Sequence, residues 1–242
     1  MLFRSIYRLM AIFAIMLYAN TLAFSQDEVP VIEPVARFIN SNGEEEESNN
    51  YSGDAPLVAQ FMANPKNQGD YTAHYEWRFT REGEAEPFLI RYDEDTEYTF
   101  KNAGTHTVVC YAIFTKGNDR IEYTDEYWKD SGPIRVTISE SSLEMPNAFS
   151  PNGDGYNDVY KAKKYKSIVE FHAYIFNRWG QKLYEWDSPE GGWDGTFNGK
   201  DVKQGTYFVL VKATGSDGRK YNIRRDVNLL RGFVENSGTP EN

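Results

Sequence analysis

The segment from residue 152 to residue 158 reads Asn-Gly-Asp-Gly-Tyr-Asn-Asp and concentrates oxygen-bearing side chains that could bind a metal ion. Asn152, Asp154 and Asp158 offer the amide and carboxylate oxygens that a hard cation such as Ca²⁺ prefers, although the spacing is shorter than in an EF-hand. A second interpretation is a turn in which these side chains accept hydrogen bonds from their own backbone and the glycines supply positive φ. A surface that a partner recognises is compatible with both interpretations.

Two short blocks place a tryptophan beside glycine: Asn-Arg-Trp-Gly at residues 177–180 and Gly-Trp-Asp-Gly at residues 192–195. Exposed indole rings could form a platform on which a carbohydrate stacks. The glycine flanks instead favour corners where a large ring closes the end of a β-sandwich, so we expect Trp179 and Trp193 to pack there. The arginine of the first block is a candidate ion-pair partner for the aspartate of the second block or for another carboxylate.

The sequence contains little that indicates a catalytic site. His74, His106 and His172 are isolated and lack the spacing of metal ligands. No Gly-x-Ser-x-Gly elbow, glycine-rich phosphate loop or Cys/His nucleophile pair is present. The single cysteine, Cys110, lies in the apolar run 107–114, which indicates a small core residue on a buried strand rather than a reactive thiol. We therefore predict a protein that is not an enzyme and has no cofactor, with Ca²⁺ as the one candidate ion.

The first 25 residues have the pattern of a secretory signal peptide. Arg4 and Arg8 precede the apolar run 9–17, and residues 23–25, Ala-Phe-Ser, place small residues where signal peptidase acts. The apolar run is too short for a comfortable membrane span. We expect cleavage before Gln26, and export of a mature chain without a transmembrane segment.

Composition predicts an all-β protein, because aromatic residues make up 15% of the chain and glycine and proline punctuate short apolar runs. Residues 26–52 are polar and include the acidic run 44–47, so we expect a flexible leader there. An acidic run can also collect calcium, but a solvated tether is the favoured interpretation. The charge is uneven: residues 26–145 hold 10 Lys and Arg against 24 Asp and Glu, whereas residues 146–242 hold 14 against 12. The acidic half argues against nucleic acid as a partner.

Strand signals divide the rest of the chain into two predicted β-sandwiches. Residues 53–140 show several short strands of alternating pattern and predict an immunoglobulin-like sandwich in which Trp77 packs in the core. A short polar joint precedes residues 145–234, where alternation and hairpin signals predict a second sandwich. Within it, residues 206–211 are expected to form a second strand that is more fully buried than the alternating strand at residues 169–175. Residues 235–242 are expected to be a frayed tail.

The blocks at residues 146–158, 175–180, 192–195 and 226–231, taken in this order, closely resemble the gliding-motility-associated C-terminal domain. That domain is the type B sorting signal of the Bacteroidetes type IX secretion system. Residues 53–140 loosely resemble a PKD-type domain, although the usual PKD tryptophan-aspartate-glycine-like turn is absent.

The resemblance implies export across the inner membrane by the signal peptide, then passage through the type IX translocon to the cell surface or outer membrane. It also implies a PorP/SprF-like outer-membrane barrel as a partner. We expect a non-enzymatic accessory or signalling component of this machinery; the alternative is a small adhesin or glycan-binding module that uses the same route. The residues to which the resemblance assigns sorting or partner binding are Pro146, Asn147, Phe149, Pro151, Asn152, Gly153, Asp154, Gly155, Asn157, Asp158, Asn177, Arg178, Trp179, Gly180, Trp193, Asp194, Gly195 and Arg231.

A basic cluster at residues 161–166, with Arg219-Lys220 and Arg224-Arg225, could meet an anionic surface. Candidates are lipopolysaccharide, acidic loops of an outer-membrane barrel, and the acidic half of this same chain. A solvated basic face is the plain alternative.

Overall fold

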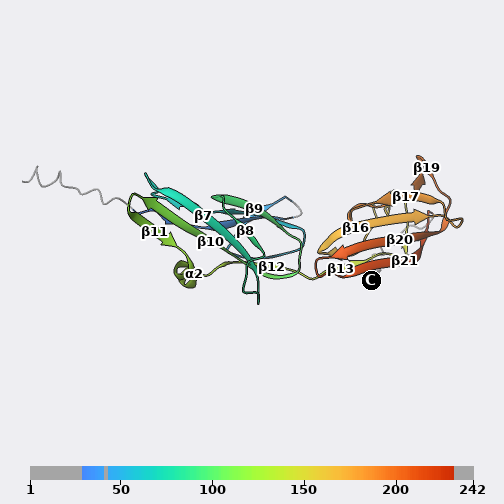
Figure 1. The fold of residues 1–242 in the computed structure, drawn as a ribbon. Helices are drawn as coiled ribbons and strands as arrows, with labels where there is room; N and C mark the ends of the chain where they lie inside the picture. The colour runs from blue at the N-terminus through green and yellow to red at the C-terminus, as the bar shows by residue number, and fades with distance from the viewer. Residues whose placement is uncertain (1–28, 41–42, 232–242) are drawn as a thin grey trace, which may run out of the picture.

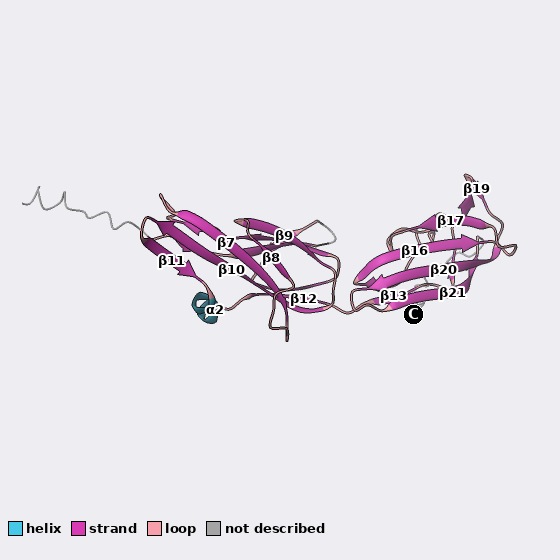
Figure 2. Ribbon diagram, in the orientation of Figure 1, coloured by secondary structure: helices cyan, strands magenta, loops and turns pink. Residues whose placement is uncertain are grey.

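The computed structural model of the protein describes residues 29–40 and 43–231. Almost all of its regular structure is strand, arranged as two β-sandwiches that follow one another along the chain (Figures 1 and 2). This confirms the predicted all-β class with two consecutive sandwiches. Over the described ranges, no helix is both long enough and apolar enough to span a bilayer. The predicted signal peptide at residues 1–25 and the tail at residues 235–242 lie outside the described residues.

The first sandwich packs a six-stranded sheet against a four-stranded sheet. The six-stranded sheet has the order β4 (Asn50–Gly53), β12 (Ile134–Ile138), β10 (Gly104–Lys116), β7 (Thr72–Arg81) and β8 (Leu89–Arg91), with β11 (Asp119–Tyr123) also paired to β10. The four-stranded sheet has the order β3 (Glu45–Glu47), β2 (Val35–Ile39), β5 (Leu57–Met62) and β9 (Asp95–Phe100). The short strands β1 (Val31–Ile32) and β6 (Pro65–Lys66) pair with each other, and helix α2 (Asp125–Ser131) follows β11.

The core of this sandwich is rich in aromatic rings. Trp77 is fully buried beside Phe61, and Cys110 is fully buried on β10, as expected for a packing tryptophan and a small core residue. Burial raises the pKa of the Cys110 thiol to about 12, so the group stays protonated and unreactive at neutral pH.

The prediction of a flexible leader at residues 26–52 is wrong for the described part of that segment. Strand β2 pairs with β5 and places Ala36 and Phe38 at zero exposure in the core. The ring of Tyr51, on β4, stacks on Phe38 with 4.2 Å between centroids. Five alternating residues are enough to form a strand once a partner sheet is present, and only the tertiary contacts supply that partner.

The acidic run that suggested a tether forms the exposed edge strand β3. Arg37 on the neighbouring strand forms ion pairs with Glu45 at 3.6 Å and Glu47 at 2.9 Å. Charged side chains on a free edge discourage pairing with another chain. The acidic run therefore belongs to the first sandwich and protects its edge.

A pH dependence of stability is expected from His106, which is buried at 2% exposure and whose Nδ1 has no hydrogen-bond partner in the described part of the chain. Burial lowers the pKa of His106, so the unfolded chain binds more protons than the folded chain. The free energy of unfolding should then fall from about pH 7.5 to about pH 5.5, across the unfolded-state pKa of about 6.5. Urea denaturation at several pH values should show a smaller pH dependence of the free energy of unfolding for His106→Gln than for the wild type.

The second sandwich is built on a five-stranded sheet. Its order is β14 (Ala148–Phe149), β21 (Lys220–Leu229), β20 (Gly205–Gly215), β16 (Ile168–Phe176) and β17 (Lys182–Trp186). Two further pairs complete the sandwich: β13 (Ser142–Glu144) with β15 (Lys164–Lys166), and β18 (Thr196–Phe197) with β19 (Lys200–Asp201). The first strand of the five-stranded sheet, β14, runs parallel to the last, β21, so segments from near the beginning and the end of the domain lie side by side.

Hydrogen bonds connect the two sandwiches at their junction. The Ala55 amide donates to Ser167 Oγ at 3.0 Å, and the Ala103 amide donates to the Ser216 carbonyl at 2.9 Å. The Ser216 hydroxyl in turn donates to the Ser139 carbonyl at 2.8 Å. These bonds bring loops of both sandwiches onto the same short joint.

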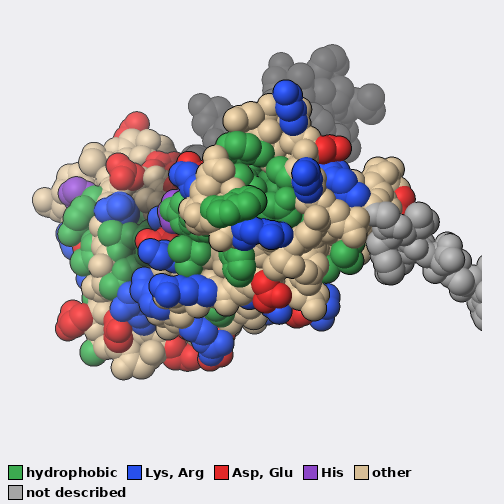
Figure 3. All heavy atoms as spheres, turned by 90° about the vertical axis from the view of Figure 1, so that its right-hand side faces the viewer, with side chains coloured by type: hydrophobic (Ala, Val, Ile, Leu, Met, Phe, Trp, Pro, Cys, Tyr) green, Lys and Arg blue, Asp and Glu red, His purple; other side chains and the backbone are tan. Residues whose placement is uncertain are grey.

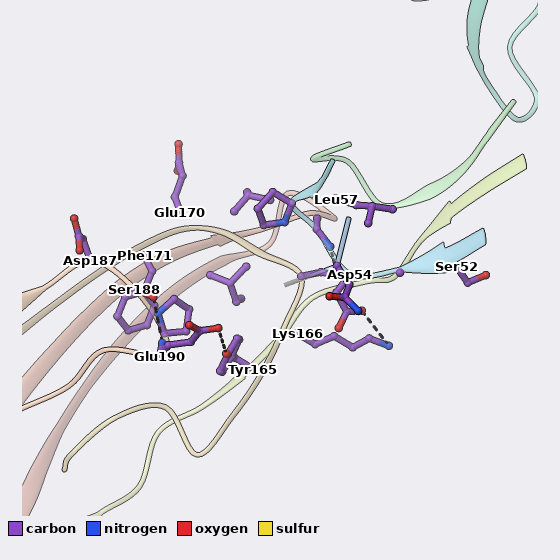
Figure 4. A pocket seen from close by; sticks show the side chains of 18 of the residues that line it. Ser52, Asp54, Leu57, Tyr165, Lys166, Glu170, Phe171, Asp187, Ser188 and Glu190 are labelled. Carbon is purple, nitrogen blue, oxygen red and sulfur yellow. Dashed lines mark hydrogen bonds and ion pairs between the residues drawn. The ribbon is translucent and has the colours of Figure 1, made fainter. Parts of the chain in front are cut away.

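A crevice of about 640 Å³ opens beside this junction, lined by residues of both sandwiches (Figure 4). Lys166 of the second sandwich lies 3.7 Å from Asp54 of the first. On the side of the second sandwich, the Tyr165 hydroxyl donates to Glu190 at 2.9 Å. The junction is polar at its rim, and Val169 of the second sandwich adds an apolar contact with the core of the first.

Candidate functional site

The sequence blocks singled out above gather at the end of the second sandwich that lies farthest from the junction, here called the distal end (Figure 1). Strand β16 starts at Ile168 opposite Gly215, next to the junction, and ends at Phe176 opposite Phe208. Strand β21 ends at Leu229, paired in parallel with β14. A nine-residue strand spans about 30 Å, which is the distance between the junction and the distal end.

Arg231 joins three segments at the distal end with one guanidinium group. Its Nη2 donates to the Gly195 carbonyl at 2.7 Å, and its Nη1 donates to the Pro151 carbonyl at 3.2 Å. Its Nε donates to the Val202 carbonyl at 3.2 Å, and Asp201 lies 3.2 Å from Nη2. A planar fork of five N–H donors suits this simultaneous bonding. Arg231 is therefore a structural tie between blocks that are far apart in sequence.

Trp193 closes the core at this end. The side chain has zero exposure and packs against Phe149 and Tyr207, with ring centroids 5.3 and 5.1 Å away. Its indole N–H donates to the Thr196 carbonyl at 2.8 Å, and its backbone pairs with that of Tyr160. The packing role expected for Trp193 is confirmed.

Steric constraints explain the glycines on both sides of Trp193. A Cβ on Gly192 would lie 2.6 Å from the Tyr160 carbonyl oxygen. Gly195 has φ of +81°, and a Cβ there would lie 3.1 Å from Pro151 and 3.2 Å from Arg231. The Gly-Trp-Asp-Gly block thus allows the indole to be inserted while two backbone segments pass close by.

The loop at residues 152–158 is held by the Asp158 carboxylate. Oδ1 accepts the amides of Asn152 at 2.9 Å and Gly153 at 2.7 Å, and Oδ2 accepts the amide of Gly155 at 2.8 Å. This geometry supports the interpretation as a backbone-bonded turn. Among the described residues, no group of three or more His, Cys, Asp or Glu side chains could hold a metal ion. A Ca²⁺ ion at Asn152, Asp154 and Asp158 stays a prediction, and it would compete with these amides for oxygen atoms.

The same geometry predicts how this loop responds to acid. The amide of Gly153, followed by that of Gly155, holds the pKa of Asp158 below its usual range. The loop is therefore stabilised above the unfolded-state pKa of about 3.9 and loses this stabilisation as pH falls through the lower folded-state pKa. The NMR shifts of both glycine amides should change only in that acidic range, and in Asp158→Asn they should already be displaced at neutral pH. Asp154→Asn should leave them in place, because Asp154 accepts the amide of Tyr156 instead.

The block at residues 177–180 forms the turn between β16 and β17. Asn177 Oδ1 accepts the amides of Trp179 and Gln181, each at 3.0 Å, and the Gly180 amide donates to the Asn177 carbonyl. The ring of Trp179 is 81% exposed. The packing role expected for Trp179 is therefore wrong, because the turn directs the side chain into solvent. The guanidinium of Arg178 lies 5.5 Å from the Trp179 ring centroid.

The suggested pairing of Arg178 with Asp194 does not form in this structure. Asp194 Oδ1 instead accepts the Thr196 amide at 2.9 Å and the Thr196 hydroxyl at 2.8 Å. This leaves the guanidinium of Arg178 stacked beside an exposed indole. In this block, Asn177 and Gly180 make the hydrogen bonds that fix the turn, and the side chains of Arg178 and Trp179 are exposed to solvent.

Sequence reasoning missed the outward half of strand β20. Residues 206–211 were expected to be more fully buried than the alternating strand at residues 169–175, but only Tyr207, Val209 and Val211 face the core. Phe208 is 46% exposed, and Leu210 is half-buried on the same outer face. A run of consecutive apolar residues does not show whether one face or both faces of its strand are buried. The sequence pattern therefore could not indicate that Phe208 and Leu210 face outward.

Among known proteins, a family model matches the second sandwich. No curated protein matches the chain in sequence. One solved structure is described as a tetra-tandem repeat in the extending region of a large adhesion protein; it is 10% identical, covers 84% of this chain and 68% of its own, and has a TM-score of 0.25. A family model covers most of the second sandwich: residues 143–224 match the model described as CHU_C Type IX secretion signal domain.

Proposed function

We propose that the protein is a non-enzymatic substrate of the type IX secretion system that acts at the cell surface as an accessory or signalling component of the machinery. The observation that carries this proposal is the type IX secretion signal domain at residues 143–224. The order of the blocks supports the finer assignment to the gliding-motility-associated, type B class of Bacteroidetes. A PorP/SprF-like barrel in the outer membrane is the proposed partner.

At the distal end, some residues stabilise the fold through internal contacts and others are exposed to solvent. The exposed residues support a role in recognition. Arg231, Trp193 and Gly195 are occupied with internal contacts, as described above. Arg178 and Trp179 make no comparable contribution to the core, yet Asn177 fixes the turn that carries them. A large aromatic ring held rigidly in solvent loses little conformational entropy on binding and buries much apolar area.

Export is tested by expressing the full chain in a bacterium with a functional type IX translocon and in the same strain without it. Protease-accessible protein at the cell surface is expected only in the first strain, and protein retained in the periplasm is expected in the second. Equal surface delivery in both strains would contradict the proposal.

The partner is tested by purifying the surface-delivered protein together with its neighbours after mild cross-linking. Recovery of a PorP/SprF-like barrel supports the accessory role. The alternative of an adhesin or glycan-binding module is favoured if the purified protein binds a defined glycan on an array and no barrel is recovered.

A further inference from the structure

The outer face of the five-stranded sheet is polar near the junction and apolar near the distal end. In the half near the junction, cross-strand neighbours on β16, β20 and β21 are polar, as expected for a sheet that faces water on one side. The residues of these two polar rows are Glu170, Thr214 and Lys220, and His172, Lys212 and Asn222. In this half of the sheet, every outward position in the two rows therefore carries a polar side chain.

In the half near the distal end the same outward positions are apolar. Tyr174 lies opposite Leu210, and Phe176 lies opposite Phe208. These four residues are here called the distal patch. The rings of Tyr174 and Phe176 are 6.4 Å apart, and a hollow of about 660 Å³ is lined by Phe176, Phe208 and Leu210. Phe208 is exposed and the other three side chains are half-buried, and contiguous apolar side chains on an outer face mark interaction sites.

Positive charge borders the distal patch. Arg224 continues the row of Tyr174 and Leu210, and Asp226 continues the other row. Within the described part of the chain, neither Arg178 nor Arg224 forms an ion pair. Figure 3 looks onto the distal end and shows hydrophobic side chains gathered near the middle of this face, with lysine and arginine beside them. On the other side of the patch, Glu185 and Lys182 of β17 lie opposite Tyr174 and Phe176 and form an ion pair with each other at 2.7 Å. Besides this pair, two guanidinium groups without an ion pair stand against the carboxylate of Asp226, and this balance favours an acidic occupant.

We propose that the distal patch, together with Arg178, Trp179 and Arg224, docks a protein segment in which apolar side chains alternate with carboxylates, on a component of the secretion machinery. This inference rests on the proposed function. Tyrosine, tryptophan and arginine are the residues that dominate protein interfaces. A protein segment fits better than a glycan, because three of the four patch residues, Phe176, Phe208 and Leu210, have no polar side-chain atoms to bond sugar hydroxyls. The polar atoms of the proposed surface belong to Tyr174, to the indole of Trp179 and to the two arginines.

The test compares variants of the distal patch with variants of the polar rows on the same strands. In the full chain, Phe208→Ser and Arg224→Glu should each lower surface delivery by about tenfold or more, the loss expected for an interface hot spot. Arg224→Lys should retain most delivery, because the positive charge is kept. Lys212→Glu reverses a charge on the outer face of β20 in the polar half, and its delivery should stay within about twofold of the wild type. Thermal unfolding of each purified variant shows that the fold is intact.

The outcomes separate this inference from the proposed function. If folded Phe208→Ser and Arg224→Glu reach the surface at the wild-type level, and the wild type still requires the translocon, the docking surface is refuted while the proposed function stands. If the wild type needs no translocon, both are refuted. Binding to vesicles that contain lipopolysaccharide is measured as well. If the patch variants lose vesicle binding but reach the surface at the wild-type level, the patch binds a lipid or glycan and the inference is overturned.

Discussion

Replacing Trp193 with alanine is expected to lower the free energy of unfolding of the second sandwich by about 3–5 kcal/mol, the usual cost of removing a large buried ring. The indole is fully buried, contacts Phe149 and Tyr207, and bonds the Thr196 carbonyl. The glycine-flanked backbone around it leaves little freedom to collapse into the cavity, because Gly192 already lies against the backbone of residue 160. Urea denaturation followed by tryptophan fluorescence and circular dichroism measures the change.

Trp179→Ala is the matched control, since the same residue type is removed at the same end of the domain. The Trp179 ring is 81% exposed, so its loss should change the free energy of unfolding by no more than about 0.5 kcal/mol. Surface delivery should nevertheless fall, because the proposed function assigns this ring to recognition. If both alanine variants lower the free energy of unfolding equally, the assignment of Trp193 to the core and Trp179 to the exposed surface is contradicted.

The two tryptophans also show where sequence reasoning ends. Both have a glycine as a near neighbour, and sequence alone assigned both to packing. Trp193 enters the core because its strand bridges to residue 160, whereas Trp179 lies at the tip of a hairpin whose turn is fixed by Asn177. The periodic pattern of apolar residues predicted the strands and both sandwiches. The direction of a side chain at a turn depends on tertiary placement that the local pattern does not contain.

The same limit applies to long-range contacts. The Asn-Gly-Asp-Gly loop is stabilised by side chains within seven residues, so the interpretation as a turn could be made from the sequence. Arg231 bonds carbonyls 36 and 80 residues away, and β2 gains its partner β5 only in the fold. The turn at residues 152–158 could therefore be predicted from local signals, whereas the role of Arg231 as a tie and the place of residues 35–39 in the core required the structure.

Gly215→Ala is expected to disrupt the joint between the two sandwiches. A Cβ at this position would overlap the side chain of Ser141 and lie 2.7 Å from the Asp217 carboxylate. The Ser141 hydroxyl is buried, donates to Asp217 Oδ1 at 2.6 Å and lies 2.9 Å from the Tyr221 hydroxyl. Because Ser141 belongs to the joint, the joint must move away from the second sandwich. We expect a loss of about 1–3 kcal/mol, as for overpacking of a close-packed site, and a broader distribution of distances in small-angle scattering.

The double variant Gly215→Ala/Ser141→Gly separates steric overlap from the loss of a hydrogen bond. It removes the overlapping atoms of Ser141, so the joint can return to its place and the scattering profile should approach that of the wild type. Some stability should still be missing, because a bond to a carboxylate such as that of Asp217 contributes about 1.5–3 kcal/mol. If Gly215→Ala alone leaves both the free energy of unfolding and the scattering profile unchanged, residue 141 is not packed against residue 215 in solution.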